Sequence, residues 1–163
     1  MQGQMKKMLR DAEGGQLIEF TLCLPILLTV FVGVIYFSFV LYAAHFVTNG
    51  ANDGARYAIV RGSEWKGAAC TTTSTVNCTA TNTDVSNYVA STLPGGLGAA
   101  NLTVSTTWSG KTSTGGNCDT QSGSNSPNCL VKVQTTYLVS FPLPYMSSHG
   151  MMLSSTAVMT IAQ

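Results

Sequence analysis

The chain has 163 residues, a formal net charge of +1 and only 9% charged residues, against roughly 25% in typical soluble domains. This length suffices for one domain of ordinary size. The near-neutral charge excludes the basic surface that nucleic-acid-binding proteins use, and the low charged fraction argues against an ordinary soluble protein.

The N-terminal third predicts a membrane-spanning helix. Residues 20–46 contain no Asp, Glu, Lys or Arg over 27 positions, and about 20 apolar residues span a bilayer as a helix. The polar segment before them carries Lys6, Lys7 and Arg10. Positive residues beside a membrane segment favour the cytoplasmic side. We therefore expect the N-terminus inside and most of the chain outside.

A cleavable secretory signal is the alternative interpretation of the same run. Its apolar core would have about 7–15 residues and would be followed by a cleavage site made of small residues. Ala43 and Ala44 could form such a site. The run is about twice that length, so we favour a permanent single-pass helix.

The helical pattern continues beyond the apolar run, to about residue 61. This outer half carries an alanine-rich stripe on one face, formed by Ala43, Val47, Ala51, Ala55 and Ala58 or Ile59. Gly50 and Gly54 form a step of small residues on the same helix. Such a step either allows another element to approach closely or merely weakens an exposed helix, and the sequence leaves both readings open.

The remaining residues predict a small mixed domain. Residues 83–93 read as a short helix, with Thr83 or Asp84 as its N-cap and Pro94 after its end. Alternating apolar residues predict strands at 101–108, 130–141 and 152–163. We expect an α+β fold in which about three antiparallel strands are covered on one face by the alanine-rich stripe.

Four of the five cysteines, Cys70, Cys78, Cys118 and Cys129, follow the membrane run, and Cys23 lies inside it. An even number in an oxidising compartment predicts two disulfides, with three possible connectivities. We favour Cys70–Cys78 and Cys118–Cys129, because each local pair closes a loop rich in small polar residues. A metal site is disfavoured since no CxxC pair is present, and we expect no cofactor.

Few residues could support catalysis. Beyond residue 65 the only acids are Asp84 and Asp119, and the two histidines, His45 and His149, stand alone. The sequence has no HExxH motif and no serine elbow of the GxSxG type. We expect that the protein is not an enzyme.

The string EGGQLIEF, residues 13–20, places Gly14 five residues before Glu19, just ahead of the apolar run. It resembles the class III signal peptide of type IV pilins, in which a prepilin peptidase cuts after a glycine on the cytoplasmic side. The resemblance implies cleavage after Gly14, which leaves Gly15 as the new N-terminus, with a cut after Gly15 as the alternative. It also implies that Glu19 of one subunit pairs with the α-amino group of Gly15 in a neighbour.

Three further motifs occur in order: Glu19-Phe20, Leu24-Pro25 and the run Gly54-Ala55-Arg56-Tyr57-Ala58. Together they are similar to the TadE-like family of tight-adherence (Flp) pilus proteins, over about residues 14–62, and the closing strand-turn-strand pattern also fits. The resemblance implies a type IV pilin-like fold. We take Phe20, Pro25, Gly50 and Gly54 as candidate helix-packing positions. We expect Pro25 to kink or locally melt the helix.

The resemblance also implies an organisation: a leader at 1–14, a transmembrane and assembly helix at 15–46, a protruding continuation at 47–61 and an external domain at 62–163. Its implied function is that of a pilin-like subunit, a minor pilin or pseudopilin, of a Tad-type pilus and secretion apparatus that acts in surface adhesion. The alternative is a single-pass anchored external binding or structural module that is not assembled into pili.

The implied partners are other pilin subunits, the prepilin peptidase and the inner-membrane assembly platform. The implied location is the bacterial inner membrane, with a cytoplasmic N-terminus and a periplasmic C-terminal domain, or an extracellular pilus. The sequence does not distinguish a major from a minor subunit.

Overall fold

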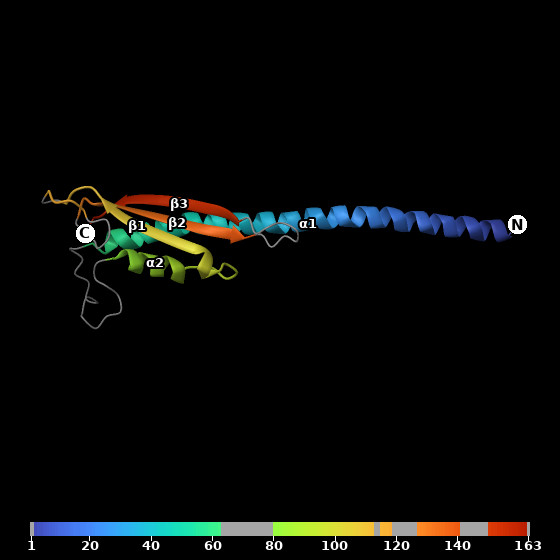
Figure 1. Cartoon of the computed structure of the whole chain (residues 1–163), viewed down its shortest axis with the longest axis horizontal. Helices are drawn as coiled ribbons and strands as arrows, with labels where there is room; N and C mark the ends of the chain where they lie inside the picture. The colour runs from blue at the N-terminus through green and yellow to red at the C-terminus, as the bar shows by residue number, and fades with distance from the viewer. Residues whose placement is uncertain (1, 63–79, 113–114, 119–126, 141–149, 163) are drawn as a thin grey trace. The chain divides into compact units, whose positions relative to one another are not determined.

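The structure, a computed structural model, describes residues 2–62, 80–112, 115–118, 127–140 and 150–162, with side chains from residue 15 onward. Its elements are α1 (Gln2–Val60), α2 (Asn82–Ser91), a short 3-10 helix η1 (Ala99–Asn101), β1 (Leu102–Ser109), β2 (Leu130–Ser140) and β3 (Gly150–Thr160) (Figure 1). The predicted α+β, pilin-like fold is confirmed. The chain divides into two compact units, Met1–Leu41 and Tyr42–Gln163.

The first helix begins earlier than the sequence pattern predicted. α1 starts at Gln2, within the expected leader, rather than at the start of the expected assembly helix at 15–46. Residues 2–14 include Met, Lys, Gln, Arg and Ala, which are good helix formers. Pro25 lies inside α1 and the helix continues through it, so the expected local melting does not occur. Proline has no N–H to donate to the carbonyl four residues earlier, and α1 tolerates this loss at one position.

The second unit contains a three-stranded antiparallel sheet in the order β1-β2-β3. The central strand β2 buries alternate side chains, as its sequence pattern predicted: Val131, Val133, Thr135, Tyr137 and Val139 are at most 3% exposed. Trp108 of β1 is fully buried opposite Val131. β3 begins at Gly150, two residues before the predicted start, because Gly150 pairs with Ser140 and Met151 with Val139.

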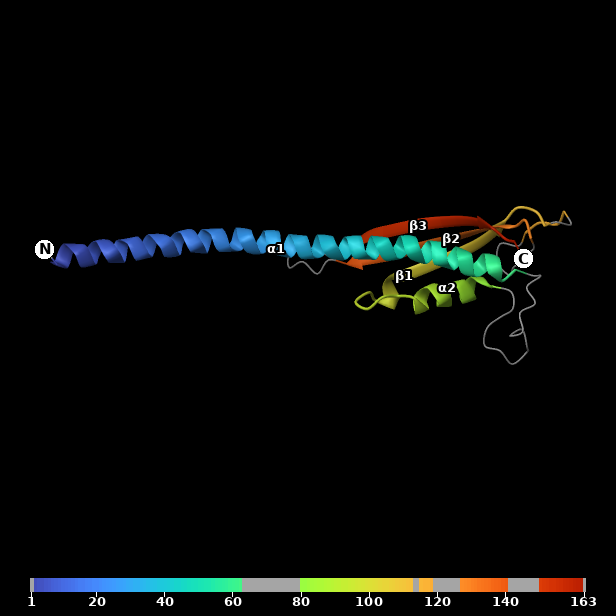
Figure 2. The ribbon, with the colours of Figure 1, turned by 180° about the vertical axis from the view of Figure 1, so that it is seen from behind.

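The inner face of this sheet is covered by the second-unit part of α1, residues 42–60 (Figure 2). The predicted stripe is buried: Ala43, Val47, Ala51, Ala55 and Ala58 are at most 1% exposed. A Cβ atom on Gly50 would lie 3.2 Å from Cγ1 of Val89 in α2 and 3.8 Å from Cγ2 of Thr135 in β2. The small-residue step therefore marks a close approach between elements of one chain, which answers the question left open by the sequence.

The N-cap of α2 lies two or three residues before the predicted positions. Thr81, rather than Thr83 or Asp84, is the N-cap residue. The backbone N–H of Asp84 donates to Thr81 Oγ1 at 3.2 Å, and the backbone N–H of Thr81 donates to Asp84 Oδ2 at 3.0 Å. This reciprocal pattern is a capping box, which satisfies two backbone donors at once, and it gives Asp84 a structural role three residues into the helix.

A disulfide closes the connection between β1 and β2. Cys118 and Cys129 are bonded, with their Cα atoms 5.9 Å apart, which confirms the predicted local pair. Both side chains are buried. Cys70 and Cys78 lie outside the described residues, and their pairing stays a prediction.

Candidate membrane and assembly segment

The part of α1 in the first unit leaves its apolar side chains uncovered. Most of the large hydrophobic residues between Leu17 and Leu41 are 41–69% exposed and occur on all sides of the helix, whereas Tyr36, Phe39 and Val40 are half-buried. By length and composition, the helix from Gly15 onward can cross a membrane. Soluble proteins seldom expose a contiguous apolar surface above a few hundred Å², so this segment needs lipid or partner protein around it.

The serine and threonine hydroxyl groups within the segment are all satisfied by the helix's own backbone. The Oγ1 atoms of Thr21 and Thr29 donate to the carbonyls of Leu17 and Pro25, each at 2.7 Å, and Ser38 Oγ donates to Val34 O at 2.8 Å. These are the only Ser or Thr residues between Phe20 and Leu41. Burying a hydroxyl group in hydrocarbon without a hydrogen-bond partner costs up to several kcal/mol. These intrahelical hydrogen bonds therefore suit a segment that lies in an apolar medium.

The predicted cleavage and charge-pair residues lie together at the start of the apolar segment. Gly14 and Gly15 are both within α1, and a Cβ atom on Gly15 would meet nothing within 4 Å. Glu19 is exposed, and within the described part of the chain it makes no ion pair. Cleavage and intermolecular pairing depend on other molecules, so both stay predictions.

The four predicted helix-packing residues fall into two groups. Gly50 and Gly54 pack against α2 and β2 inside the chain. Phe20 is 64% exposed, and Pro25 lies within the same uncovered helical segment. The structure thus assigns the glycines to the fold of the second unit and leaves Phe20 and Pro25 on the surface that requires a partner or lipid.

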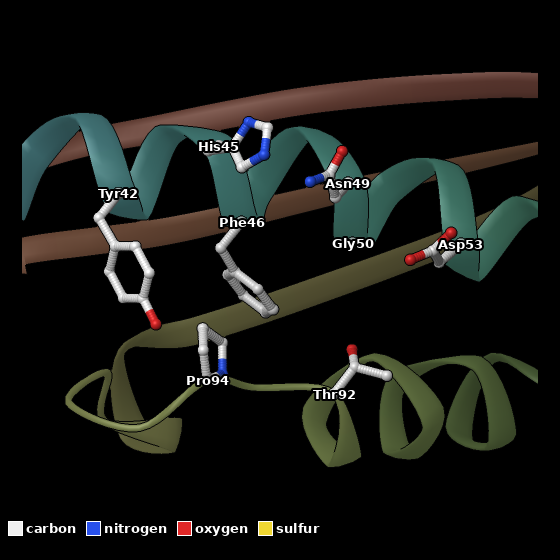
Figure 3. A pocket seen from close by; sticks show the side chains of 8 residues that line it. All are labelled: Tyr42, His45, Phe46, Asn49, Gly50, Asp53, Thr92 and Pro94. Atoms are coloured by element: carbon white, nitrogen blue, oxygen red, sulfur yellow. The ribbon is translucent and has the colours of Figure 1, made fainter.

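A shallow pocket of about 210 Å³ lies between α1 and the end of α2, lined by Tyr42, His45, Phe46, Asn49, Gly50, Asp53, Thr92 and Pro94. Figure 3 shows Tyr42 and Phe46 extending from α1 toward Pro94. No cluster of three His, Cys, Asp or Glu side chains suitable for a metal occurs among the described residues. The described lining contains no cysteine or serine that could act as a nucleophile beside His45 and Asp53. Its described residues therefore form no catalytic arrangement of that kind.

A ring cluster at the end of α1 was not foreseen from the sequence. The Tyr57 and Tyr88 rings stack with centroids 4.4 Å apart, and the Arg61 guanidinium lies 3.9 Å from the Tyr57 ring centroid. Burial raises the pKa of the Tyr57 phenol, and nearby Arg61 partly opposes this shift. The spacing of four residues between Tyr57 and Arg61 places both side chains on one face of a helix, so their contact could have been predicted from the sequence. The contact with Tyr88 depends on how α1 and α2 pack.

Comparison with known proteins gives one family. The family model described as TadE-like protein matches residues 14–56, so the resemblance inferred from the motifs is confirmed over that segment. Neither a curated protein nor a solved structure matches the chain significantly. The matched segment contains the glycines, Glu19, the uncovered apolar surface and most of the alanine-rich stripe.

Proposed function

With residues 14–56 matching the TadE-like family, we propose that this Tad pilus-associated, single-pass membrane protein is a pilin-like subunit. A prepilin peptidase removes its leader on the cytoplasmic side. The apolar part of α1 first anchors the chain in the inner membrane and then packs among the helices of other subunits at the assembly platform.

The observation that carries this proposal is the uncovered apolar surface of α1 between Leu17 and Leu41. A simple membrane anchor also needs such a surface. The family match and the position of Gly14, Gly15 and Glu19 directly before it favour a segment that is cut and then assembled. Head-to-tail packing of such helices gives a contact that need not close, which is the geometry of a filament.

Glu19 supports a specific role in that packing. Cleavage after Gly14 creates an α-amino group on Gly15, whose ordinary pKa is about 7.7–8.0. An unpaired carboxylate in an apolar filament core costs several kcal/mol. Pairing Glu19 with the amino group of a neighbouring Gly15 removes that cost and fixes how far one helix is shifted along the next.

The second unit, with its capped α2 and its disulfide-closed sheet, forms the external domain on the periplasmic side or in an extracellular pilus. We assign it to a minor pilin or pseudopilin that contributes to surface adhesion. The alternative function is a membrane-anchored external module that never enters a pilus; an anchor of that kind has no need of a cleavage glycine five residues before an acid.

The N-terminal mass of the protein purified from cell envelopes tests the proposal. We expect removal of residues 1–14 and no processing in cells that lack the prepilin peptidase. Intact-mass spectrometry of a Gly14→Val, Gly15→Val variant provides the uncleaved control. Retention of Met1 in the wild-type protein contradicts the pilin-like function, whereas a cut after Gly15 moves the new N-terminus by one residue and leaves the function intact.

A further inference from the structure

The two outer edges of the sheet differ in how well they are protected. On the β1 edge, the backbone N–H of Thr106 donates to Oδ1 of Asn82 at 3.0 Å, so α2 supplies a partner for an edge group. On the β3 edge, no backbone hydrogen bond is present among the described residues. A second chain can therefore pair with β3, whereas Asn82 blocks the middle of β1.

The backbone groups that β3 offers can be identified. Ile161 N–H donates to Cys129 O at 2.8 Å at the end of the β2–β3 pairing. Hydrogen-bonded residues alternate along an antiparallel ladder, so the odd-numbered residues of β3 bond to β2. The N–H and C=O groups of Met152, Ser154, Thr156 and Val158 consequently point away from the sheet.

β3 carries none of the features that normally protect an edge. Natural sheets use charged residues, proline, bulges or short strands to prevent edge pairing. Residues 150–160 include no charged residue and no proline, and they pair with β2 one to one over the whole length of the strand. Met152 and Val158 are 70% and 56% exposed.

The inner face is also incompletely covered at this edge. The inward side chains of β2 are at most 3% exposed, whereas Met151 is 48% exposed and Leu153, Ser155 and Met159 are only half-buried. A strand added beside β3 would cover these side chains as well as pair the free backbone groups.

The sequence of β3 is nearly symmetric about Ser155. In an antiparallel pair of two β3 strands centred on that residue, similar residues lie opposite one another: Met151 with Met159, Met152 with Val158, and Ser154 with Thr156. The outward-pointing backbone groups of Ser154 and Thr156 then face each other as a hydrogen-bonded pair. The same register thus satisfies the backbone and matches apolar and hydroxyl side chains.

We propose that β3 pairs antiparallel with β3 of a second copy of this chain, about a two-fold axis at Ser155, to form a six-stranded sheet. This pairing is isologous and closes at two copies. The Tyr42–Val60 segments, which pack on the same sheets, run in opposite directions in such a pair. The pairing rests on the edge of β3 and does not depend on the proposed pilin function. For a chain assembled into pili, it joins copies from two oppositely directed assemblies rather than neighbours within one polar array.

Cysteine cross-linking in the full chain tests the register. In a Cys23→Ser background in detergent, Ser155→Cys places two thiols at directly opposed positions, where Cβ atoms approach to about 4.5–5.5 Å. We expect a disulfide-linked dimer from Ser155→Cys and none from the control Ser105→Cys, which lies on the β1 edge where Asn82 already occupies the backbone N–H of Thr106. Equal cross-linking of both variants, or of neither, overturns the proposal.

Introducing charges on β3 provides a second test that does not depend on oxidation. Chains with Ser154→Lys and Thr156→Lys place like charges opposite each other, as do chains with Ser154→Glu and Thr156→Glu. We expect each variant alone to raise the dimer dissociation constant roughly tenfold or more, and a mixture of the two to restore pairing. Light scattering measures the dimer, and the absence of a wild-type dimer, or of a restored dimer in the mixture, contradicts the pairing. Ser154 and Thr156 are both exposed, and circular dichroism checks that the variants fold.

Discussion

Gly54 of α1 and Val89 of α2 are in such close contact that a Cβ atom on the glycine would lie 2.9 Å from Val89 Cγ2. Val133 and Val85 would lie 3.2 and 3.3 Å from the same atom. Together with Gly50, this position allows α1 to approach both α2 and β2 closely.

The first prediction concerns Gly54→Ala. Overpacking a core position costs about 1–3 kcal/mol, and replacing a helical glycine by alanine returns up to about 1 kcal/mol. We expect a net loss of about 1–2 kcal/mol in the free energy of unfolding of the second unit. Denaturant titration of the full chain in detergent, followed by tryptophan fluorescence, measures it.

Gly33→Ala is the matched control, because a Cβ atom there meets nothing within 4 Å. It gains helix propensity without overpacking, so the second unit should keep its stability. Equal effects of the two substitutions would show that Gly54 is not a packing residue.

The second prediction concerns the disulfide. Replacing Cys118 and Cys129 together by serine removes the link that closes the β1–β2 connection. A bridge over a loop of this size contributes about 2–4 kcal/mol, and we expect the midpoint of thermal unfolding to fall accordingly. Cys23→Ser, which removes an exposed thiol in the first unit, serves as the control; an identical midpoint in the double variant and the control would refute the role of the bridge.

The periodic elements were predictable because each is specified by neighbouring residues. The stripe from Ala43 to Ala58 and the alternation in β2 predicted which side chains are buried, and local spacing predicted the Cys118–Cys129 pair. The boundary of α2 depends on a finer signal. Thr81 and Thr83 are both acceptable N-caps, and only the position of Asp84 three residues after Thr81 distinguishes them.

Contacts between distant elements were not predictable from the pattern. The bond from Thr106 to Asn82 and the Tyr57–Tyr88 stack both require that α2 be placed beside β1 and α1. The two readings of Gly50 and Gly54 were equally compatible with the sequence, since it does not say which side chains lie against a helix. Cleavage, the Glu19 pair and the domain boundaries stay predictions.

The third prediction concerns pH. Because burial raises the pKa of Tyr57 in the folded protein, the folded state retains this proton more tightly than the unfolded state. That contribution to stability is complete below the unfolded pKa of about 10. It is lost as pH rises through the higher folded pKa.

We therefore expect the wild-type unfolding free energy to decrease more between about pH 8 and about pH 11 than that of Tyr57→Phe, which has no phenol to ionise. Denaturant titrations at the two pH values measure the difference. If the wild type and Tyr57→Phe lose stability equally over this range, the shift at Tyr57 does not contribute.

The fourth prediction concerns Glu19. Glu19→Gln keeps the size of the side chain and removes its charge, and Glu19→Ala removes both. We expect both variants to insert in the membrane and lose the leader, but to be strongly reduced in sheared pili, because neither can pair with the amino group of Gly15. Immunoblots of sheared pili and of membranes from the same cells measure the ratio; wild-type amounts of Glu19→Gln in pili would exclude charge pairing.

The hydroxyls of Thr21, Thr29 and Ser38 already have their partners in the helix's own backbone. These three groups gain no hydrogen bond from lipid and lose none when lipid is replaced by the side chains of another helix. For these three groups, the move from a bilayer to the helices of other subunits exchanges one apolar medium for another without any change in hydrogen bonding.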